Sequence, residues 1–183
     1  MSKGYSGLFH GTLGTSFKNG ISSQPYSDRG IEIPEHIKHT LAKLKKTGDT
    51  VSGKVGSFPI KDVSIMSKEA GVEFAHITID GKTYLIRGDK HGAVVPQYLM
   101  NKMSKHGGTL DFHSHPYDND CVPSRADRKM ISELKNITGQ TSSKIVTPNG
   151  RTVTFGEHGV ISTGTVPNVI DDKLKQAYLE LWR

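Results

Sequence analysis

The fold of this chain depends on one stretch, residues 109–134, which reads TLDFHSHPYDNDCVPSRADRKMISEL. Its first residues, Leu110-Asp111-Phe112, predict a short strand that leads into His113 and His115. Side chains alternate between the two faces of a strand, which places Leu110, Phe112 and Ser114 on one face and Asp111, His113 and His115 on the other. Two imidazoles on one face, two residues apart, can bind a single metal ion.

A helix is predicted after the polar loop that follows Pro116. Ser124 is a good N-cap for this helix, and its apolar positions follow helical spacing at Ala126, Met130, Ile131 and Leu134. Asp127 falls on the first turn, where its carboxylate can turn back toward the two histidines. Two neutral imidazoles and one carboxylate leave a position open for water, which is the ligand set of a catalytic rather than a structural zinc site. The predicted zinc ligands are therefore His113, His115 and Asp127.

This arrangement resembles the JAMM family of zinc metallopeptidases, also called JAB or MPN-plus. That family carries an upstream Glu, a His-x-His-Pro motif, a short loop and a Ser-x-x-Asp motif. The matching residues here are His113, His115, Ser124 and Asp127, and the wording Pro-Ser-Arg-Ala-Asp is common among bacterial members. The chain departs from the family in the loop between His115 and Ser124, whose eight residues are one more than the family pattern has. A surface loop absorbs one residue at little cost.

The upstream glutamate of the resembling family has its best match in Glu73. A β-hairpin is predicted from strands at residues 71–79 and 82–87, because the Asp80-Gly81 pair between them is a strong hairpin signal. Glu73 lies near the start of the first strand, where the family places its catalytic Glu. Glu69 is the alternative, in a less strand-like context. Taken without the histidines, Glu73 would be interpreted as an exposed strand carboxylate.

The resemblance implies a mechanism for these residues. Zn²⁺ held by His113, His115 and Asp127 would lower the pKa of a bound water toward ~7. Glu73 would take that proton and later deliver it to the departing amine. The Ser124 hydroxyl would donate to the developing oxyanion. In the family the bond cut is often an isopeptide bond to a lysine, or a peptide bond.

The remaining segments predict further helices and strands. They are a helix beginning at Ile33-Pro34-Glu35, extended segments within residues 51–65, a helix beginning at Pro96, a hairpin at 143–147 and 151–155, a strand at 160–163 and a last helix at 168–182. The order predicts an α/β fold, a mixed sheet with flanking helices. From about residue 33 to 155 it agrees with the JAMM/MPN architecture, which is cytidine-deaminase-like. Residues 1–32 are predicted as a Gly/Ser-rich lead-in or linker, and residues 33–183 as the catalytic domain.

Composition sets the outer limits of the interpretation. With 183 residues and 34% hydrophobic residues, the chain is long enough for one domain with a core. The formal net charge of +6 permits a nucleic-acid partner without favouring one. No run reaches the length of a membrane span, and no signal-peptide core follows the first residues.

The Gly/Ser-rich beginning, the abrupt C-terminal end and the compact basic unit resemble the C-terminal toxin domain of a bacterial polymorphic toxin, some of which carry JAB-type domains. That resemblance implies secretion as part of a larger toxin, delivery into a target cell and action in its cytoplasm. The expected partners are a protein or peptide substrate and a cognate immunity protein.

Other interpretations of the same residues stay open at this point. Ser-x-x-Asp before an apolar run is also a plain helix-capping pattern. Cys121 lies in the same loop as the motif and suggests a Cys-His nucleophilic enzyme, although no oxyanion motif accompanies it. A metal-dependent nuclease could use the same His/Asp cluster, and a non-catalytic MPN-like interaction module would keep only the fold.

Overall fold

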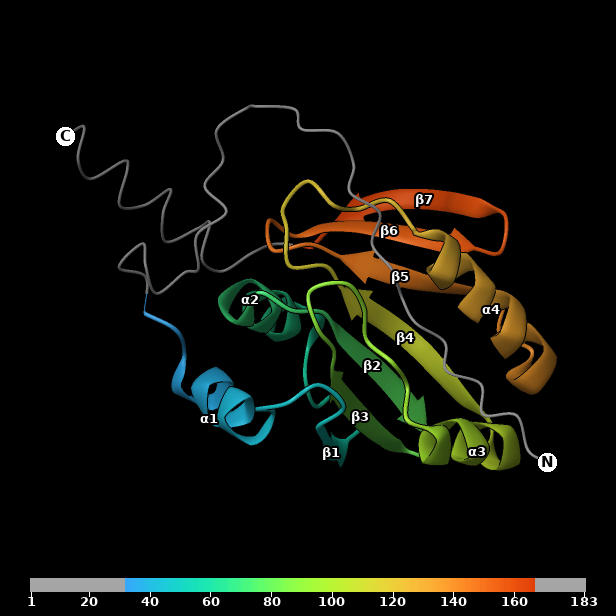
Figure 1. Ribbon diagram of the computed structural model, residues 1–183, viewed down its shortest axis with the longest axis horizontal. Coiled ribbons are helices and arrows are strands. Elements are labelled where there is room, and N and C mark those ends of the chain that lie inside the picture. Colours follow the sequence, from blue (N-terminus) through green and yellow to red (C-terminus); the bar gives the residue numbers. More distant parts are fainter. Residues whose placement is uncertain (1–31, 167–183) are drawn as a thin grey trace.

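The computed structural model describes residues 32–166 of the chain. The helix predicted at residues 168–182 lies outside the described residues, as does the predicted lead-in except for Glu32. The described part has a mixed α/β fold, in which one seven-stranded sheet carries helices on both faces (Figure 1). The predicted fold class, a mixed sheet with flanking helices, is confirmed at this level.

The sheet has the strand order β1-β3-β2-β4-β5-β6-β7. The strands are β1 (Thr50–Lys54), β2 (Phe74–Ile79), β3 (Lys82–Arg87), β4 (Gly108–Ser114), β5 (Ser142–Val146), β6 (Arg151–Gly156) and β7 (Gly159–Thr165). Neighbouring strands are antiparallel except for β4 and β5, which are parallel. A parallel pair needs a crossover connection, and here the crossover contains helix α4. Helix α4 begins at the same end of the sheet at which β4 ends, and the chain returns through α4 to the start of β5.

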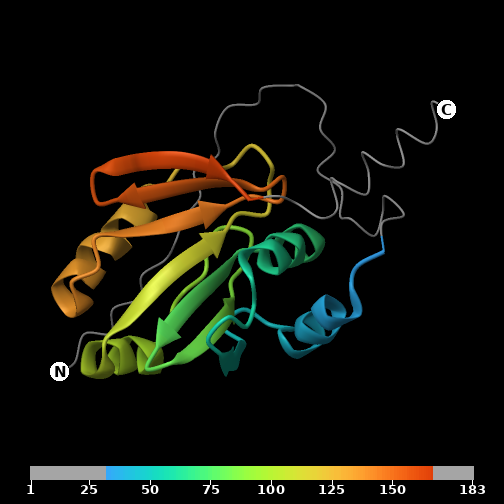
Figure 2. The ribbon, with the colours of Figure 1, turned by 180° about the vertical axis from the view of Figure 1, so that it is seen from behind.

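The four helices of the described region divide between the two faces of the sheet. They are α1 (Glu35–Lys43), α2 (Ile60–Ala70), α3 (Gln97–His106) and α4 (Arg125–Thr138). Figures 1 and 2 show α1 and α2 on one face and α3 and α4 on the other. Each pair covers its own apolar cluster, one that includes Ile37, Val63, Met66, Phe74 and Leu85, and one that includes Ile77, Leu99, Met103, Ile131 and Leu134. Both faces of the central strands are therefore buried, and the site at their ends rests on a packed support.

The prediction of extended structure at residues 51–65 is wrong for its second half. Only Thr50–Lys54 is a strand, and Ile60 begins the helix α2, whose N-cap is Pro59. Val63 and Met66 are three residues apart, which is helical spacing, and both are buried against the sheet. The nearby glycines and Pro59 led to the prediction of broken extended segments instead. Gly71, with φ of 63°, ends the helix in the left-handed conformation.

The predicted alternation along β4 is also wrong, because the strand contains a β-bulge. His76 of β2 pairs with Phe112 and Ile77 pairs with Leu110, so Asp111 is an extra residue without a partner on β2. Leu110 and Phe112 consequently belong to different apolar clusters, on opposite faces of the sheet. Asp111 contacts His76 and Thr78 and does not share a face with His113.

The predicted turns are confirmed and both hairpins form, but the strand predicted at residues 71–79 begins only at Phe74, so Glu73 lies before it. Asp80 and Gly81 have φ of 48° and 69°, the left-handed pair that a two-residue hairpin turn requires, and Lys82–Arg87 forms β3 as predicted. The second hairpin pairs β5 with β6. The strand predicted at residues 160–163 is β7, which is longer than predicted.

We predict that Leu134→Ala lowers the free energy of unfolding by about 2–5 kcal/mol, because Leu134 is 1% exposed and its loss leaves a cavity between α4 and the sheet. Ile137→Ala is the matched control on the same helix. Ile137 is 37% exposed, and its truncation should change stability by no more than about 0.5 kcal/mol. Urea unfolding measures both, and equal losses would contradict the packing of α4 against the sheet through Leu134.

Candidate metal centre

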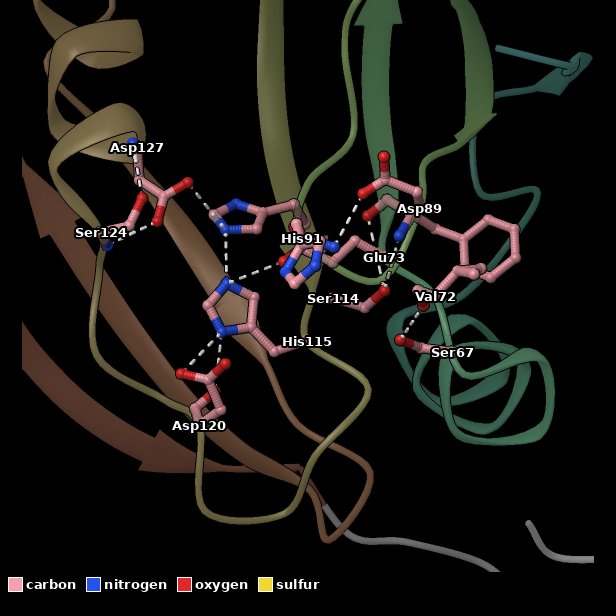
Figure 3. Close-up of polar contacts among 12 residues, drawn as sticks. Ser67, Val72, Glu73, Asp89, His91, Ser114, His115, Asp120, Ser124 and Asp127 are labelled. Atoms are coloured by element: carbon pink, nitrogen blue, oxygen red, sulfur yellow. Dashed lines mark hydrogen bonds and ion pairs between the residues drawn. The ribbon is translucent and has the colours of Figure 1, made fainter. Parts of the chain in front are cut away.

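Three segments far apart in the sequence meet at one end of the sheet (Figure 3). His113 lies near the end of β4 and His115 follows that strand. Glu73 directly precedes β2, and the antiparallel pairing of Phe74 with Ser114 places it beside the histidines although forty residues separate it from His113. The crossover then brings in the first turn of α4 with its N-cap, Ser124.

The ring nitrogens and one carboxylate converge closely. Nε2 of His113 lies 3.1 Å from Nε2 of His115 and 3.3 Å from Oδ1 of Asp127. Two ligands of a tetrahedral zinc ion, each at 2.0–2.1 Å, are separated by about 3.3 Å. Each of these two separations, both measured from His113, is that of two ligands of one ion. Among the described residues, however, the group whose ligand atoms all lie within 4.8 Å of one another is Glu73, His113 and His115, and Asp127 is not part of it.

Glu73 stands slightly further from the histidines. Its Oε1 lies 3.9 Å from Nε2 of His115, and Glu73, His113 and His115 each offer one ligand atom within 4.8 Å of the others. The site thus has two carboxylates for the two imidazoles. The wider separation of Glu73 suits a group that faces a bound water, although its carboxylate is also within reach of an ion.

The two carboxylate oxygens of Asp127 have different surroundings. Oδ2 accepts a hydrogen bond from the backbone N–H of Ser124 at 2.6 Å, while Oγ of Ser124 accepts from the N–H of Asp127 at 3.1 Å. This is the capping box, so the plain capping interpretation of Ser-x-x-Asp is correct as far as it goes. Oδ1 is buried, faces His113 and accepts no hydrogen bond within residues 32–166. A buried acceptor left in this state costs free energy, and a cation at the site would satisfy it.

The orientation of His115 is fixed by the loop that follows it. Its Nδ1 lies 2.8 Å from the backbone carbonyl of Asp120. A carbonyl only accepts, so Nδ1 carries the hydrogen, and in the neutral ring the lone pair is then on Nε2, which faces the cluster. Metal-binding histidines commonly have this second interaction. This contact cannot be predicted from the sequence, because the partner is a backbone atom in a polar run.

Glu73 is held by its backbone as well as by the sheet. Its N–H donates to the carbonyl of Asp89 at 2.9 Å, and its carbonyl accepts from the N–H of Gly88 at 2.8 Å. A Cβ at Gly88 would lie 2.1 Å from the carbonyl oxygen of Gly92, so only glycine fits in this loop. The loop after β3 is thus a part of the site that sequence reasoning missed.

Burial dominates the electrostatics of the cluster. Glu73, His113, His115 and Asp127 are each no more than 3% exposed. Burial raises the pKa of Glu73 to about 8, and burial lowers the pKa of His113 to about 4, which keeps that ring neutral near pH 7. For His115 burial acts downward, but the contact with Asp120 and the nearby carboxylates raise the pKa to about 9. The neighbouring carboxylates therefore stabilise the positively charged form of the His115 ring.

The remaining candidates from the sequence lie outside this cluster. Glu69, the alternative to Glu73, is a partly buried residue of α2. Cys121 is buried in the loop before α4, and it is not part of the ligand group that the described residues form. The predicted histidines, Glu73 and Asp127 are brought together, with Ser124 beside them.

Comparison of the chain with protein-family models, with curated proteins and with solved structures found no match. The described residues form a mixed α/β fold with a buried His/His/carboxylate cluster at one end of the sheet. Among the helices within residues 32–166, none has the length and apolar character that crossing a membrane requires.

We predict that the purified protein binds about one zinc ion per chain and that His113→Ala/His115→Ala binds none. Ligand binding to the folded state adds about 2.7 kcal/mol to stability at a free zinc concentration of 100 Kd. The parent should therefore melt at a higher temperature when zinc is added, and the double variant should not. His36→Ala/His158→Ala is the matched control, because these side chains are 64% and 94% exposed. A parent without zinc after zinc is offered would exclude the metal centre.

Proposed function

We propose that this protein is a zinc-dependent metallopeptidase of the JAMM type that hydrolyses a peptide or isopeptide bond with water as the nucleophile. The observation that carries the proposal is the buried group of Glu73, His113 and His115, whose ligand atoms lie within 4.8 Å of one another, together with Asp127 Oδ1 at 3.3 Å from His113 Nε2. His113, His115 and Asp127 would hold the zinc. When bound, zinc supplies Lewis acidity that lowers the pKa of water and polarises a carbonyl.

Glu73 is the proposed general base and acid. Its carboxyl group is buried, and its Oε1 lies 3.9 Å from Nε2 of His115, where it can reach a water molecule bound beside the histidines. In the proposed reaction its Oε1 takes a proton from the attacking water and then delivers it to the departing amine. The backbone contacts of Glu73 with Gly88 and Asp89 hold this carboxyl at the site.

Ser124 is the proposed donor to the oxyanion that develops on the carbonyl oxygen. The hydroxyl oxygen already accepts a hydrogen bond from the N–H of Asp127. A serine hydroxyl has one donor in addition to its acceptor capacity, so the O–H remains able to donate while the cap is intact. Ser124 is 8% exposed, which provides the water-poor surroundings in which such a donor is most effective.

The finer architecture and the biological setting belong to the same proposal. A His-x-His segment at the end of one strand, a glutamate directly before the neighbouring strand and a crossover helix that starts with Ser-x-x-Asp support the JAMM/MPN arrangement. The sequence supports the setting of a toxin domain that is delivered into a target cell, cleaves a protein there and is neutralised by an immunity protein.

We predict that Glu73→Gln abolishes hydrolysis and retains zinc, because the amide cannot accept a proton. The assay uses zinc-loaded protein on a library of fluorescence-quenched peptides and on lysine-branched isopeptides. Glu69→Gln is the matched control and should keep full activity. Full activity of Glu73→Gln would contradict the assigned role. Zinc-dependent cleavage of RNA or DNA, without cleavage of either peptide probe, would favour a nuclease instead.

We predict that Ser124→Gly separates the capping role of Ser124 from the catalytic role. Glycine at an N-cap costs only a few tenths of a kcal/mol relative to serine, so stability and zinc content should change little. Loss of one oxyanion donor lowers kcat by about 10²–10³. Ser124→Thr keeps the hydroxyl and should keep most of the activity. Equal kcat values for the glycine and threonine variants would show that Ser124 is a helix cap only.

A further inference from the structure

A lysine is buried on α2, at the side of the candidate metal centre. Lys68 is 3% exposed, and its Nζ lies 3.1 Å from Oδ2 of Asp118, whose side chain is 16% exposed. An ammonium group removed from water loses its hydration, and a buried ion pair commonly adds no net stability compared with apolar side chains of similar size. The position of this pair therefore calls for a role other than stability.

The pair connects α2 to the loop between β4 and α4. Asp118 lies in the middle of that loop and has a second contact besides Lys68. Its backbone carbonyl accepts a hydrogen bond at 3.1 Å from Nδ2 of Asn149, in the turn between β5 and β6. The loop closes on itself where the N–H of Asp120 donates to the carbonyl of Tyr117 at 3.2 Å. Two other parts of the fold thus hold the loop at Asp118.

The same loop provides the acceptor for His115. The carbonyl of Asp120, two residues beyond Asp118, lies 2.8 Å from Nδ1 of His115, and Oδ1 of Asp120 lies 3.4 Å from the same nitrogen. The acceptor is a backbone atom, so its position depends on where the loop is held. A displacement of about 1 Å at Asp118 would lengthen this bond beyond the range of a good hydrogen bond.

We infer that Lys68 is a positioning residue of the metal centre. Through Asp118 it fixes the loop, and through the carbonyl of Asp120 the loop holds the hydrogen of His115 on Nδ1 and keeps Nε2 for the metal. This inference rests on the proposed function, because it assigns Nε2 of His115 as a zinc ligand. Lys68 is assigned no part in the chemistry itself.

The test uses variants of the ion pair in the full chain, with zinc affinity measured by competition with a chelator of known affinity. Changes to the second interaction of a metal-binding histidine typically weaken metal affinity by 10–100-fold. We predict a loss of that size for Lys68→Met and for Asp118→Asn. Lys68→Met/Asp118→Asn removes both charges of the pair, so metal-free stability should return toward the parent value. The zinc affinity of this double variant should stay low.

A second readout does not involve the metal. The Nδ1–H proton of His115 should give a solvent-protected ring N–H signal in nuclear magnetic resonance spectra of the parent, and it should exchange faster with water in the variants. Lys135→Met is the matched control, because Lys135 forms an exposed ion pair with Glu157 at the other end of α4. Its zinc affinity and ring N–H exchange should equal those of the parent.

The outcomes separate this inference from the proposed function. If the parent binds zinc through its histidines and the folded double variant binds it within about threefold of the parent, the positioning role is wrong and the metal centre stands. In that case the ion pair contributes to stability only. If the parent binds no zinc, both proposals fail. Low zinc affinity with restored stability and faster Nδ1–H exchange supports the role of Lys68.

Discussion

The antiparallel pairing of β2 with β4 is the constraint on which the rest of the site depends. Phe74 stands opposite Ser114, and the hydroxyl of Ser114 accepts a hydrogen bond from the N–H of Phe74 at 3.0 Å. This register places Glu73, one residue before Phe74, beside His113 and His115, which flank Ser114. A slip of one residue would turn every side chain of the strand to the opposite face and separate the carboxylate from the imidazoles.

The crossover from β4 to β5 completes the cluster. Because these two strands are parallel, the chain must return along the sheet, and α4 begins near the point at which β4 ends. The first turn of a helix has unpaired N–H groups and a partial positive charge, so a carboxylate there is stabilised. Asp127 uses this position twice, since one oxygen closes the capping box and the other faces His113. Helix capping and metal ligation therefore do not compete as explanations of the Ser-x-x-Asp motif.

Burial gives the cluster its chemical character. Carboxylates and imidazoles that are almost fully removed from water interact strongly, and their pKa values move away from those of the free side chains. The positions of these buried side chains depend on the backbone segments that carry them. The loop at Gly88 supports Glu73, and the loop at Asp120 supports His115. The two apolar clusters on either face of the sheet support both.

The sequence by itself determined the local features of this protein. The Asp80-Gly81 turn, the N-cap Ser124 and the residues of the His-x-His and Ser-x-x-Asp motifs can be recognised because each depends on neighbours within a few positions. Only the tertiary structure decided the bulge at Asp111, the helix after Pro59 and the contact of Asp120 with His115. The bulge follows from pairing with a distant strand, and the helix follows from packing against the sheet. The Asp120 contact is made by a backbone carbonyl, and the direction of that carbonyl depends on the position of the loop and not on the residue type.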